Sequence, residues 1–184
     1  MKEIHQLRKY SWACLLSTLL IAGLTACDSG DEKNHSSSAS TTKRTTQTGP
    51  AVGILVDSPV SGISYAATSG KSGVTDEQGK FNFNHGDKIE FKLGNLTLGN
   101  IVGSQIVTPI ELAGDSPNKL QNLLVLLQSL DSDANLSNGI SISSETAAAI
   151  KNSINLDSDP AKFAETAELK TIMAASGITG EVRM

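Results

Sequence analysis

A short acidic and amide-rich segment, residues 131–139, has the oxygen spacing of a cation-binding loop. Asp131, Asp133, Asn135 and Ser137 place oxygen-bearing side chains at alternate positions. Calcium prefers carboxylate, amide and carbonyl oxygens, and a loop that supplies them in this order can surround the ion. The spacing therefore predicts a calcium site formed by Asp131, Asp133 and Asn135, with Glu145 as a more distant ligand.

An ordinary polar loop is the alternative interpretation of the same residues. A calcium loop of the EF-hand type has Gly at its sixth position and Glu at its twelfth, whereas this segment has Leu136 and Ile142. Asp and Asn side chains that follow a helix also accept hydrogen bonds from neighbouring backbone N–H groups. Both interpretations stay open at the level of sequence.

The rest of the sequence has no arrangement typical of a catalytic site. His85 is the only histidine beyond residue 35, and His85-Gly86-Asp87 has the composition of a turn. No serine lies in a Gly-x-Ser-x-Gly pattern. The acidic pairs are sequence neighbours in turns rather than opposed carboxylates. We therefore expect a protein that is not an enzyme.

Composition limits the class of protein further. The chain has 184 residues, of which 39% are hydrophobic and 18% charged, and its formal charge is −4. This length supports about one ordinary domain. The acidic balance argues against nucleic acid as a partner, because phosphate backbones are bound by clustered Lys and Arg.

The N-terminus has the pattern of a secretory signal. Lys2, Arg8 and Lys9 precede an apolar run over residues 12–26, which is short for a membrane-spanning helix. The run ends in Leu24-Thr25-Ala26-Cys27, which resembles the lipobox of bacterial lipoproteins. The resemblance implies that residues 1–26 are removed and that Cys27 carries a covalent lipid, commonly including palmitate. Several acyl chains would then anchor the protein stably to a membrane.

Residues 27–49 contain the expected lipidation site, Cys27, followed by a Ser/Thr-rich segment with few apolar side chains. Such a segment cannot bury enough apolar surface to offset its chain entropy, so we expect a disordered tether. The resemblance implies a location in the bacterial cell envelope, with the lipid anchored to the outer membrane. Asp28, directly after the cysteine, is typical of inner-membrane retention in enteric bacteria, so the inner membrane stays an alternative.

Residues 50–112 have the pattern of a small antiparallel β-sandwich. Runs at 51–56, 63–68, 72–75, 80–83, 89–93, 96–98 and 101–107 are separated by turn residues. Phe81 and Phe83 alternate with Lys80 and Asn82, which predicts one buried and one exposed strand face. Gly79 suits the left-handed position of a turn, and Gly94-Asn95 suits a two-residue hairpin.

Residues 59–83 resemble the transthyretin-like or carboxypeptidase regulatory-like β-sandwich. The resemblance rests on a turn of the form Thr-Asp-x-x-Gly-x-Phe, here from Thr75 to Phe81. The later Thr108-Pro109, a Leu-rich segment and a Leu-Asp-Ser-Asp loop resemble an uncharacterised family of bacterial lipoproteins. These resemblances indicate a fold and a cellular location, but they do not indicate a ligand.

Residues 113–184 are expected to be helical, which makes the fold class α+β. Ser116-Pro117 predicts the start of a helix over 117–130 with a wide Leu stripe, which we expect to pack in the core. Ser143 or Ser144 begins a second helix to about residue 153. Asp159-Pro160 begins a third, to about residue 175, and the end of the chain is expected to fray.

Three functions fit these patterns. The first is a membrane-anchored envelope lipoprotein whose β-sandwich is a non-catalytic binding or adhesion module for an unknown protein or surface ligand. The second is an accessory subunit that docks onto an envelope complex through its Leu-rich helix, which would require an exposed apolar stripe. A third, an accessory of a periplasmic enzyme or transporter, would depend on calcium stabilising the loop at 131–139.

Overall fold

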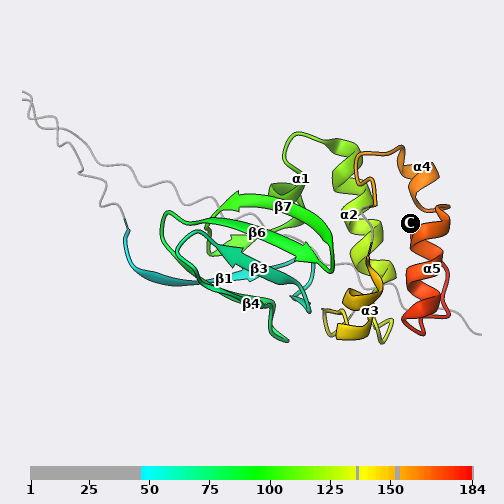
Figure 1. Cartoon of the computed structure of the whole chain (residues 1–184), viewed down its shortest axis with the longest axis horizontal. Coiled ribbons are helices and arrows are strands. Elements are labelled where there is room, and N and C mark those ends of the chain that lie inside the picture. The colour runs from blue at the N-terminus through cyan, green and yellow to red at the C-terminus, as the bar shows by residue number, and fades with distance from the viewer. Residues whose placement is uncertain (1–46, 136, 152–153, 184) are drawn as a thin grey trace, which may run out of the picture. The chain divides into compact units, whose positions relative to one another are not determined.

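A computed structural model describes residues 47–135, 137–151 and 154–183. The predictions for the signal, for Cys27 and for most of the tether fall outside these residues. Most of the strands precede the helices along the described chain, so the predicted α+β class is confirmed (Figure 1). Within the described ranges, no helix combines the length and the apolar character needed to cross a membrane.

The larger sheet has four antiparallel strands in the order β4-β3-β6-β7. The turn at Gly94-Asn95 joins β6 and β7 as a two-residue hairpin, with Leu93 opposite Leu96 and Gly94 at φ 56°. A bulge between Phe91 and Lys92 shifts the register of this hairpin. The four strands are β3 (Ser64–Ala67), β4 (Ser72–Val74), β6 (Lys88–Leu93) and β7 (Leu96–Val102).

The smaller sheet has the order β5-β1-β8. β1 (Pro50–Leu55) pairs antiparallel with β5 (Lys80–Asn84) and parallel with β8 (Ile106–Val107). The turn before β5 forms as the sequence predicts, because Asp76 Oδ1 accepts hydrogen bonds from the N–H groups of Gln78 and Lys80. Gly79 in this turn has φ 71°, and a Cβ there would lie 2.4 Å from the carbonyl oxygen of Leu55.

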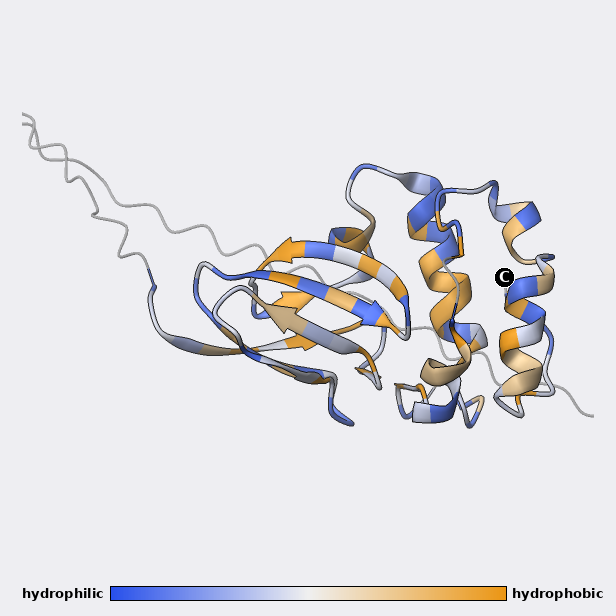
Figure 2. Cartoon of the chain, in the orientation of Figure 1, coloured by the Kyte–Doolittle hydropathy of each residue, from blue (hydrophilic) through white to orange (hydrophobic). Residues whose placement is uncertain are grey.

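Aromatic side chains join the two sheets. Phe81 of the smaller sheet lies 5.0 Å from Phe91 and 5.8 Å from Tyr65 of the larger sheet, measured between ring centroids. Phe81 and Phe83 are fully buried, whereas Lys80 and Asn82 are exposed. The predicted faces of this strand are therefore confirmed. The same alternation colours β6 in Figure 2.

The expected strand over 101–107 is interrupted. β7 ends at Val102, and the chain then leaves the larger sheet to enter the smaller one as β8. Gly103 permits this passage, because a Cβ there would lie 2.4 Å from the ring of Phe83. An alternating pattern predicts the extended backbone of both pieces, but it does not show that they belong to different sheets.

A short helix, α1 (Pro109–Ala113), follows β8 and was absent from the prediction. Its first turn is a capping box, in which the Thr108 hydroxyl accepts from Ile110 N–H and the Glu111 carboxylate accepts from Thr108 N–H. Glu111 has a lowered pKa because the Thr108 side chain, then the Thr108 backbone, bonds to its carboxylate. The Thr-Pro-x-Glu spacing was a signal for this helix.

The Leu-rich helix is α2 (Pro117–Ser129), capped by the Ser116 hydroxyl as predicted. Its stripe faces the core, and the predicted packing is confirmed: Leu123, Leu126 and Leu127 are fully buried, and so is Leu130 at its end. Leu120 and Val125 are partly buried against the same core.

The later helices are shorter than expected. Ser143 caps α3 (Ser144–Ala149), which ends before residue 150. The third expected helix is two helices, α4 (Pro160–Phe163) and α5 (Ala167–Ala175). The Thr166 hydroxyl donates to the Phe163 carbonyl at the break, and the break allows Phe163 and Leu169 both to be fully buried. α2 packs against α4, and α3 against α5 (Figure 1).

Strands and helices share one hydrophobic core, which contains residues of both 50–112 and 113–183. A second parallel pair, β2 (Val60–Ser61) with β9 (Ile140–Ser141), ties the two regions together. The Gly94-Asn95 turn also lies against α3, with Asn95 N–H donating to the carbonyl of Ile150 at 3.0 Å. The helical region is therefore packed onto the sheets along several contacts.

Candidate functional site

The segment predicted to bind calcium connects α2 to β9. Asp131 comes directly after the helix and is only 2% exposed. Its Oδ1 accepts a hydrogen bond from Ser141 N–H at 3.1 Å, while its Oδ2 is buried without a hydrogen-bond partner. Ser132 N–H donates to the Ser141 carbonyl at 2.9 Å. These bonds hold the start of the loop against β9 and leave one carboxylate oxygen free.

The predicted ligands after Asp131 form local turns. Asp133 Oδ1 accepts from Asn135 N–H at 2.9 Å, and Asn135 Oδ1 accepts from the Ser137 hydroxyl at 2.7 Å. Asn138 donates through its side chain to Asp133 Oδ2 at 2.6 Å. This is the bonding expected of a polar loop, and it keeps the Asn135 side chain within its own turn.

Asp133 has a lowered pKa. The side-chain hydrogen bond from Asn138 is the largest cause, followed by the N–H of Asn135, and the neighbouring Asp131 carboxyl contributes less. Asp131 and Asp133 line one cavity. The structure brings together these two of the predicted ligands.

Glu145 lies apart from them, in the first turn of α3. Its lowered pKa is caused first by its own backbone N–H and then by the hydroxyls of Ser143 and Ser144. The side chain therefore stabilises the start of its helix. It does not line the cavity that contains Asp131 and Asp133.

That cavity, of about 160 Å³, lies between the loop and the C-terminal segment 177–183. Asp131, Asp133 and Glu181 line it together with Arg183. Arg183 attaches the segment, since its N–H donates to the Ser129 hydroxyl at 2.9 Å and its guanidinium to the Ala134 carbonyl at 3.1 Å. The expectation that this end of the chain frays is therefore wrong as far as residue 183.

The contact between the loop after α2 and the C-terminal segment could not be predicted from the sequence, because about 50 residues separate the loop from Arg183. The only local signal was Gly177, which has φ 72° and reverses the chain after α5. Among residues 47–135, 137–151 and 154–183, no group of three or more His, Cys, Asp or Glu side chains is arranged to hold a metal. A metal at Asp131 would therefore need backbone, amide or water oxygens as further ligands.

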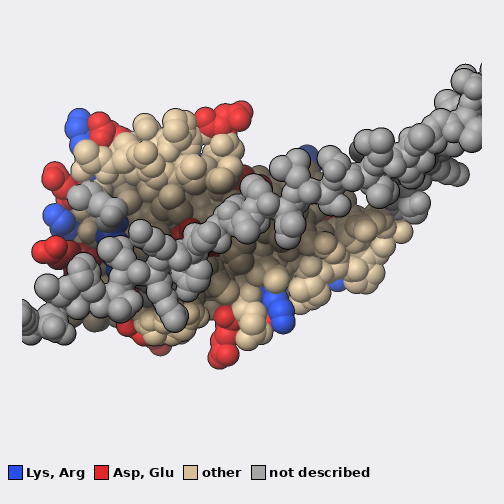
Figure 3. Space-filling model, turned by 180° about the vertical axis from the view of Figure 1, so that it is seen from behind, with Lys and Arg blue, Asp and Glu red and all other residues tan. Residues whose placement is uncertain are grey.

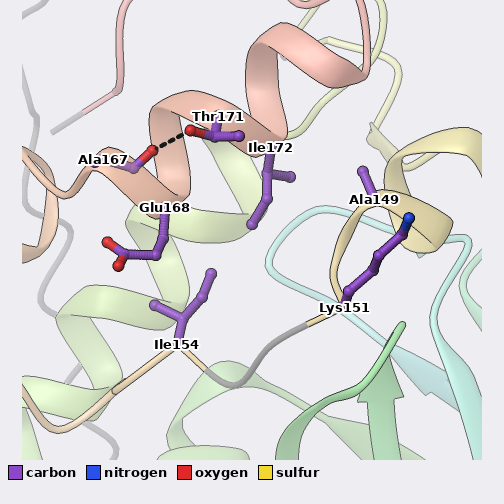
Figure 4. Close-up of a pocket in the computed structure, with 7 residues that line it drawn as sticks. All are labelled: Ala149, Lys151, Ile154, Ala167, Glu168, Thr171 and Ile172. Carbon is purple, nitrogen blue, oxygen red and sulfur yellow. Dashed lines mark hydrogen bonds between the residues drawn. The ribbon is translucent and has the colours of Figure 1, made fainter.

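Two other cavities lie among the later helices. One, of about 290 Å³, separates α3 from α5, and Ile154 and Ile172 project into it between Lys151 and Glu168 (Figure 4). The Thr171 hydroxyl is turned away to the carbonyl of Ala167 at 2.6 Å. The other, of about 540 Å³, is mainly apolar and lies between α4, α5 and residues 178–182.

The sequence also drew attention to His85 as a possible base and to Cys27 as the lipidation site. The backbone N–H of His85 donates to the Gly49 carbonyl at 2.9 Å, and its ring lies edge-on to Phe83 in the turn before β6. Cys27, the predicted lipidation site, lies outside the described residues. On the visible described surface, acidic and basic side chains are interspersed (Figure 3).

Comparison with protein-family models, with curated proteins and with solved structures finds no match to this chain.

Proposed function

We propose that this protein is a lipid-anchored bacterial envelope lipoprotein whose folded domain is a non-catalytic binding or adhesion module. The observation that carries the proposal is the sequence Leu24-Thr25-Ala26-Cys27 at the end of a basic and then apolar N-terminus. Cys27 would bear the lipid, and residues 28–49 would hold the domain away from the membrane. A flexible chain of this length spans about 25–30 Å on average.

The domain offers a surface for the binding role. Val52 and Ile106 are 51% and 63% exposed. Ile54 pairs with Ile106 across the parallel contact, so these side chains lie on the same face of the β5-β1-β8 sheet. Val52 lies two residues before Ile54 and therefore shares that face. Contiguous exposed apolar patches mark interaction sites when they are large, and we propose that this strip is part of one. We propose that the module is of the transthyretin-like group, and the Thr75–Phe81 turn and the presence of two sheets support this proposal.

The accessory-subunit alternative receives less support. It depends on a Leu stripe left exposed for a partner, whereas Leu123, Leu126 and Leu127 are fully buried within the chain itself. A partner could reach only the remaining surface of α2, on which Leu120 and Val125 are partly buried. The surface strip on the smaller sheet therefore favours the binding module.

The proposed lipidation of Cys27 is tested by metabolic labelling. Cells that express the full chain are grown with a clickable palmitate analogue, and the wild type is compared with Cys27→Ala and Cys14→Ala. Cys14 is the matched control because it is the other cysteine of the chain and lies within the proposed signal. We expect label in the wild type and in Cys14→Ala, and none in Cys27→Ala. Label that persists in Cys27→Ala would refute the lipoprotein assignment.

The location is tested separately on intact and lysed cells. Protease that digests the tagged domain on intact cells would place it on the outer surface and direct the search toward surface ligands. Digestion only after lysis would place it in the periplasm. Membrane fractionation of the wild type and of Asp28→Ser then separates the two membranes, since retention at the inner membrane through Asp28 would be lost in the variant.

A further inference from the structure

Asp131 is a buried carboxylate with one of its two oxygens without a hydrogen-bond partner. The residue is 2% exposed, and its Oδ2 has no hydrogen-bond partner, while Oδ1 is bonded to Ser141 N–H. Burying an ionised carboxylate without a partner is costly, and such groups are paired, protonated or bound to a cation. The free oxygen therefore indicates a missing partner, and Asp131 is one of the residues that line a cavity of about 160 Å³.

The surroundings of Asp131 favour a cation as that partner. The cavity is lined by three carboxylates, those of Asp131, Asp133 and Glu181, and by the single guanidinium of Arg183. Two negative charges are left in excess. The C-terminus of α2 adds to them, because it has no basic residue in its last turn and its partial charge is negative.

Arg183 is not the missing partner of Asp131. Its guanidinium donates to the Ala134 carbonyl, and Asp131 Oδ2 stays without a partner. The bond nevertheless sets the cavity wall, because it fixes residues 177–183 over the loop. The site is therefore assembled from two segments that are distant in the sequence.

We propose that Asp131 and Asp133 bind a calcium ion in this cavity, between the loop after α2 and residues 177–183. Oxygen atoms dominate the polar lining, and none of the lining residues is His or Cys, which zinc would prefer. Calcium accepts six to eight oxygens in flexible geometry, so two carboxylates can be completed by backbone carbonyls and water. Magnesium is less suited, since it demands near-ideal octahedral geometry and gives up its water reluctantly.

The small number of carboxylates predicts weak binding. The described residues hold no cluster of three or more metal-binding acidic, His or Cys side chains, so much of the coordination must be neutral. Calcium sites in extracellular modules bind with a Kd of about 10⁻⁴–10⁻³ M. We place this site in the same range. The ion would join the end of α2 to the C-terminal segment, and this role is independent of the lipid anchor.

Calcium binding is measured on the full chain, purified in detergent and freed of metal with EDTA. Equilibrium dialysis with radioactive calcium is run at constant ionic strength, with Asp131→Asn, Asp133→Asn and Asp115→Asn alongside the wild type. Asp115 is the matched control, because it is an exposed aspartate outside the cavity. We expect one saturable site in the wild type and in Asp115→Asn, and at least tenfold weaker binding in the other two variants.

Thermal unfolding, followed by circular dichroism, gives a second readout. At ten times the Kd, calcium should raise the folded-to-unfolded ratio about elevenfold. We expect this increase in the wild type and in Asp115→Asn but not in Asp133→Asn, in which the exposed carboxylate is replaced by an amide of the same shape.

Three results would overturn the proposal. The first is no saturable binding by the wild type up to 10 mM calcium, about ten times the weakest expected Kd. The second is equal binding by the wild type and Asp133→Asn. The third is the same thermal shift with magnesium as with calcium at matched ionic strength, which would indicate general charge screening. If Asp131→Asn fails to fold, the wild type and Asp133→Asn still decide the question.

Discussion

Replacing Phe81 with Ala is the most direct test of the fold, because this ring lies where the two sheets meet. Phe81 is fully buried. Its ring centroid is 5.0 Å from Phe91, 5.6 Å from Phe83 and 5.8 Å from Tyr65. The first of these contacts is edge-to-face, at an interplanar angle of 86°. Removal of the ring would leave a cavity bordered by both sheets.

The expected cost follows from the lost contacts. Truncation of a buried Phe to Ala lowers the free energy of unfolding by about 3–5 kcal/mol. Aromatic pairs at these distances contribute about 0.5–1.5 kcal/mol each beyond the area that they bury. Because Phe81 has three such neighbours, we expect the upper half of the range, about 4–5 kcal/mol. This is a large share of the roughly 5–15 kcal/mol typical of a domain.

Urea unfolding of the purified protein, followed by circular dichroism, measures this cost. With a slope of about 1.5–2 kcal/mol per M of urea, the midpoint should fall by about 2–3 M. Asn82→Ala is the matched control, because Asn82 is the next residue along β5 and its side chain is exposed on the opposite face. Its unfolding free energy should change by less than about 0.5 kcal/mol.

A small effect would refute the description of the core. A loss below about 1 kcal/mol for Phe81→Ala, with the slope unchanged, would be within the range of ordinary surface substitutions and small repacking. An equal loss for Asn82→Ala would show that the two strand faces are not distinguished as described. The variant Phe81→Leu, which keeps much of the apolar volume, should fall between Phe81→Ala and the wild type.

Two further predictions concern packing and pH. Gly99→Ala should lower the free energy of unfolding by about 1–3 kcal/mol, because a Cβ at Gly99 would lie 2.4 Å from the Leu112 carbonyl oxygen and force α1 away from β7. Gly180→Ala is the control, because a Cβ at Gly180 would have no atom within 4 Å. Equal stability of the two variants in urea would contradict this packing. The pKa of Asp87 lies below its usual value of 3.8. The largest cause is the hydrogen bond that Asn84 N–H donates to its carboxylate, and the next is the hydrogen bond from the Ser69 hydroxyl. Its stabilising contribution is therefore complete above pH 3.8 and is lost as pH falls through the lower folded pKa. The difference in unfolding midpoint between the wild type and Asp87→Asn should accordingly narrow from pH 6 to pH 2.5, and a difference independent of pH would show that the carboxylate bonds do not stabilise the fold.

Local features of this fold were predictable because their causes lie within a few residues. Phe81 and Phe83 share a face because side chains alternate along a strand. Gly79 occupies its turn because it adopts positive φ without steric cost. Ser116 and Ser143 cap helices because their hydroxyls reach the N–H groups three residues later. Each prediction required only neighbouring residues.

The candidate site was predictable only in part. The alternating oxygens identified the loop of Asp131 and Asp133, and they equally predicted the local turns that Asn135 makes. That Asp131 is buried with a free oxygen could not be predicted, because its burial depends on β9 and on the C-terminal segment. Likewise, the break between α4 and α5 serves the burial of Phe163 and Leu169, a requirement of the core rather than of helix propensity.

The sequence by itself determined the faces of β5, the turns, the starts of α2, α3 and α4 and the pattern of the N-terminus, since these depend on side-chain alternation, backbone conformation and short-range hydrogen bonds. Only the tertiary structure decided that β8 pairs in parallel with β1, that β2 pairs with β9, and that Arg183 closes the cavity over Asp131. These contacts join residues about 50 or more positions apart. No local pattern specifies such a contact, because it forms only when burial of the shared hydrophobic core brings both segments together.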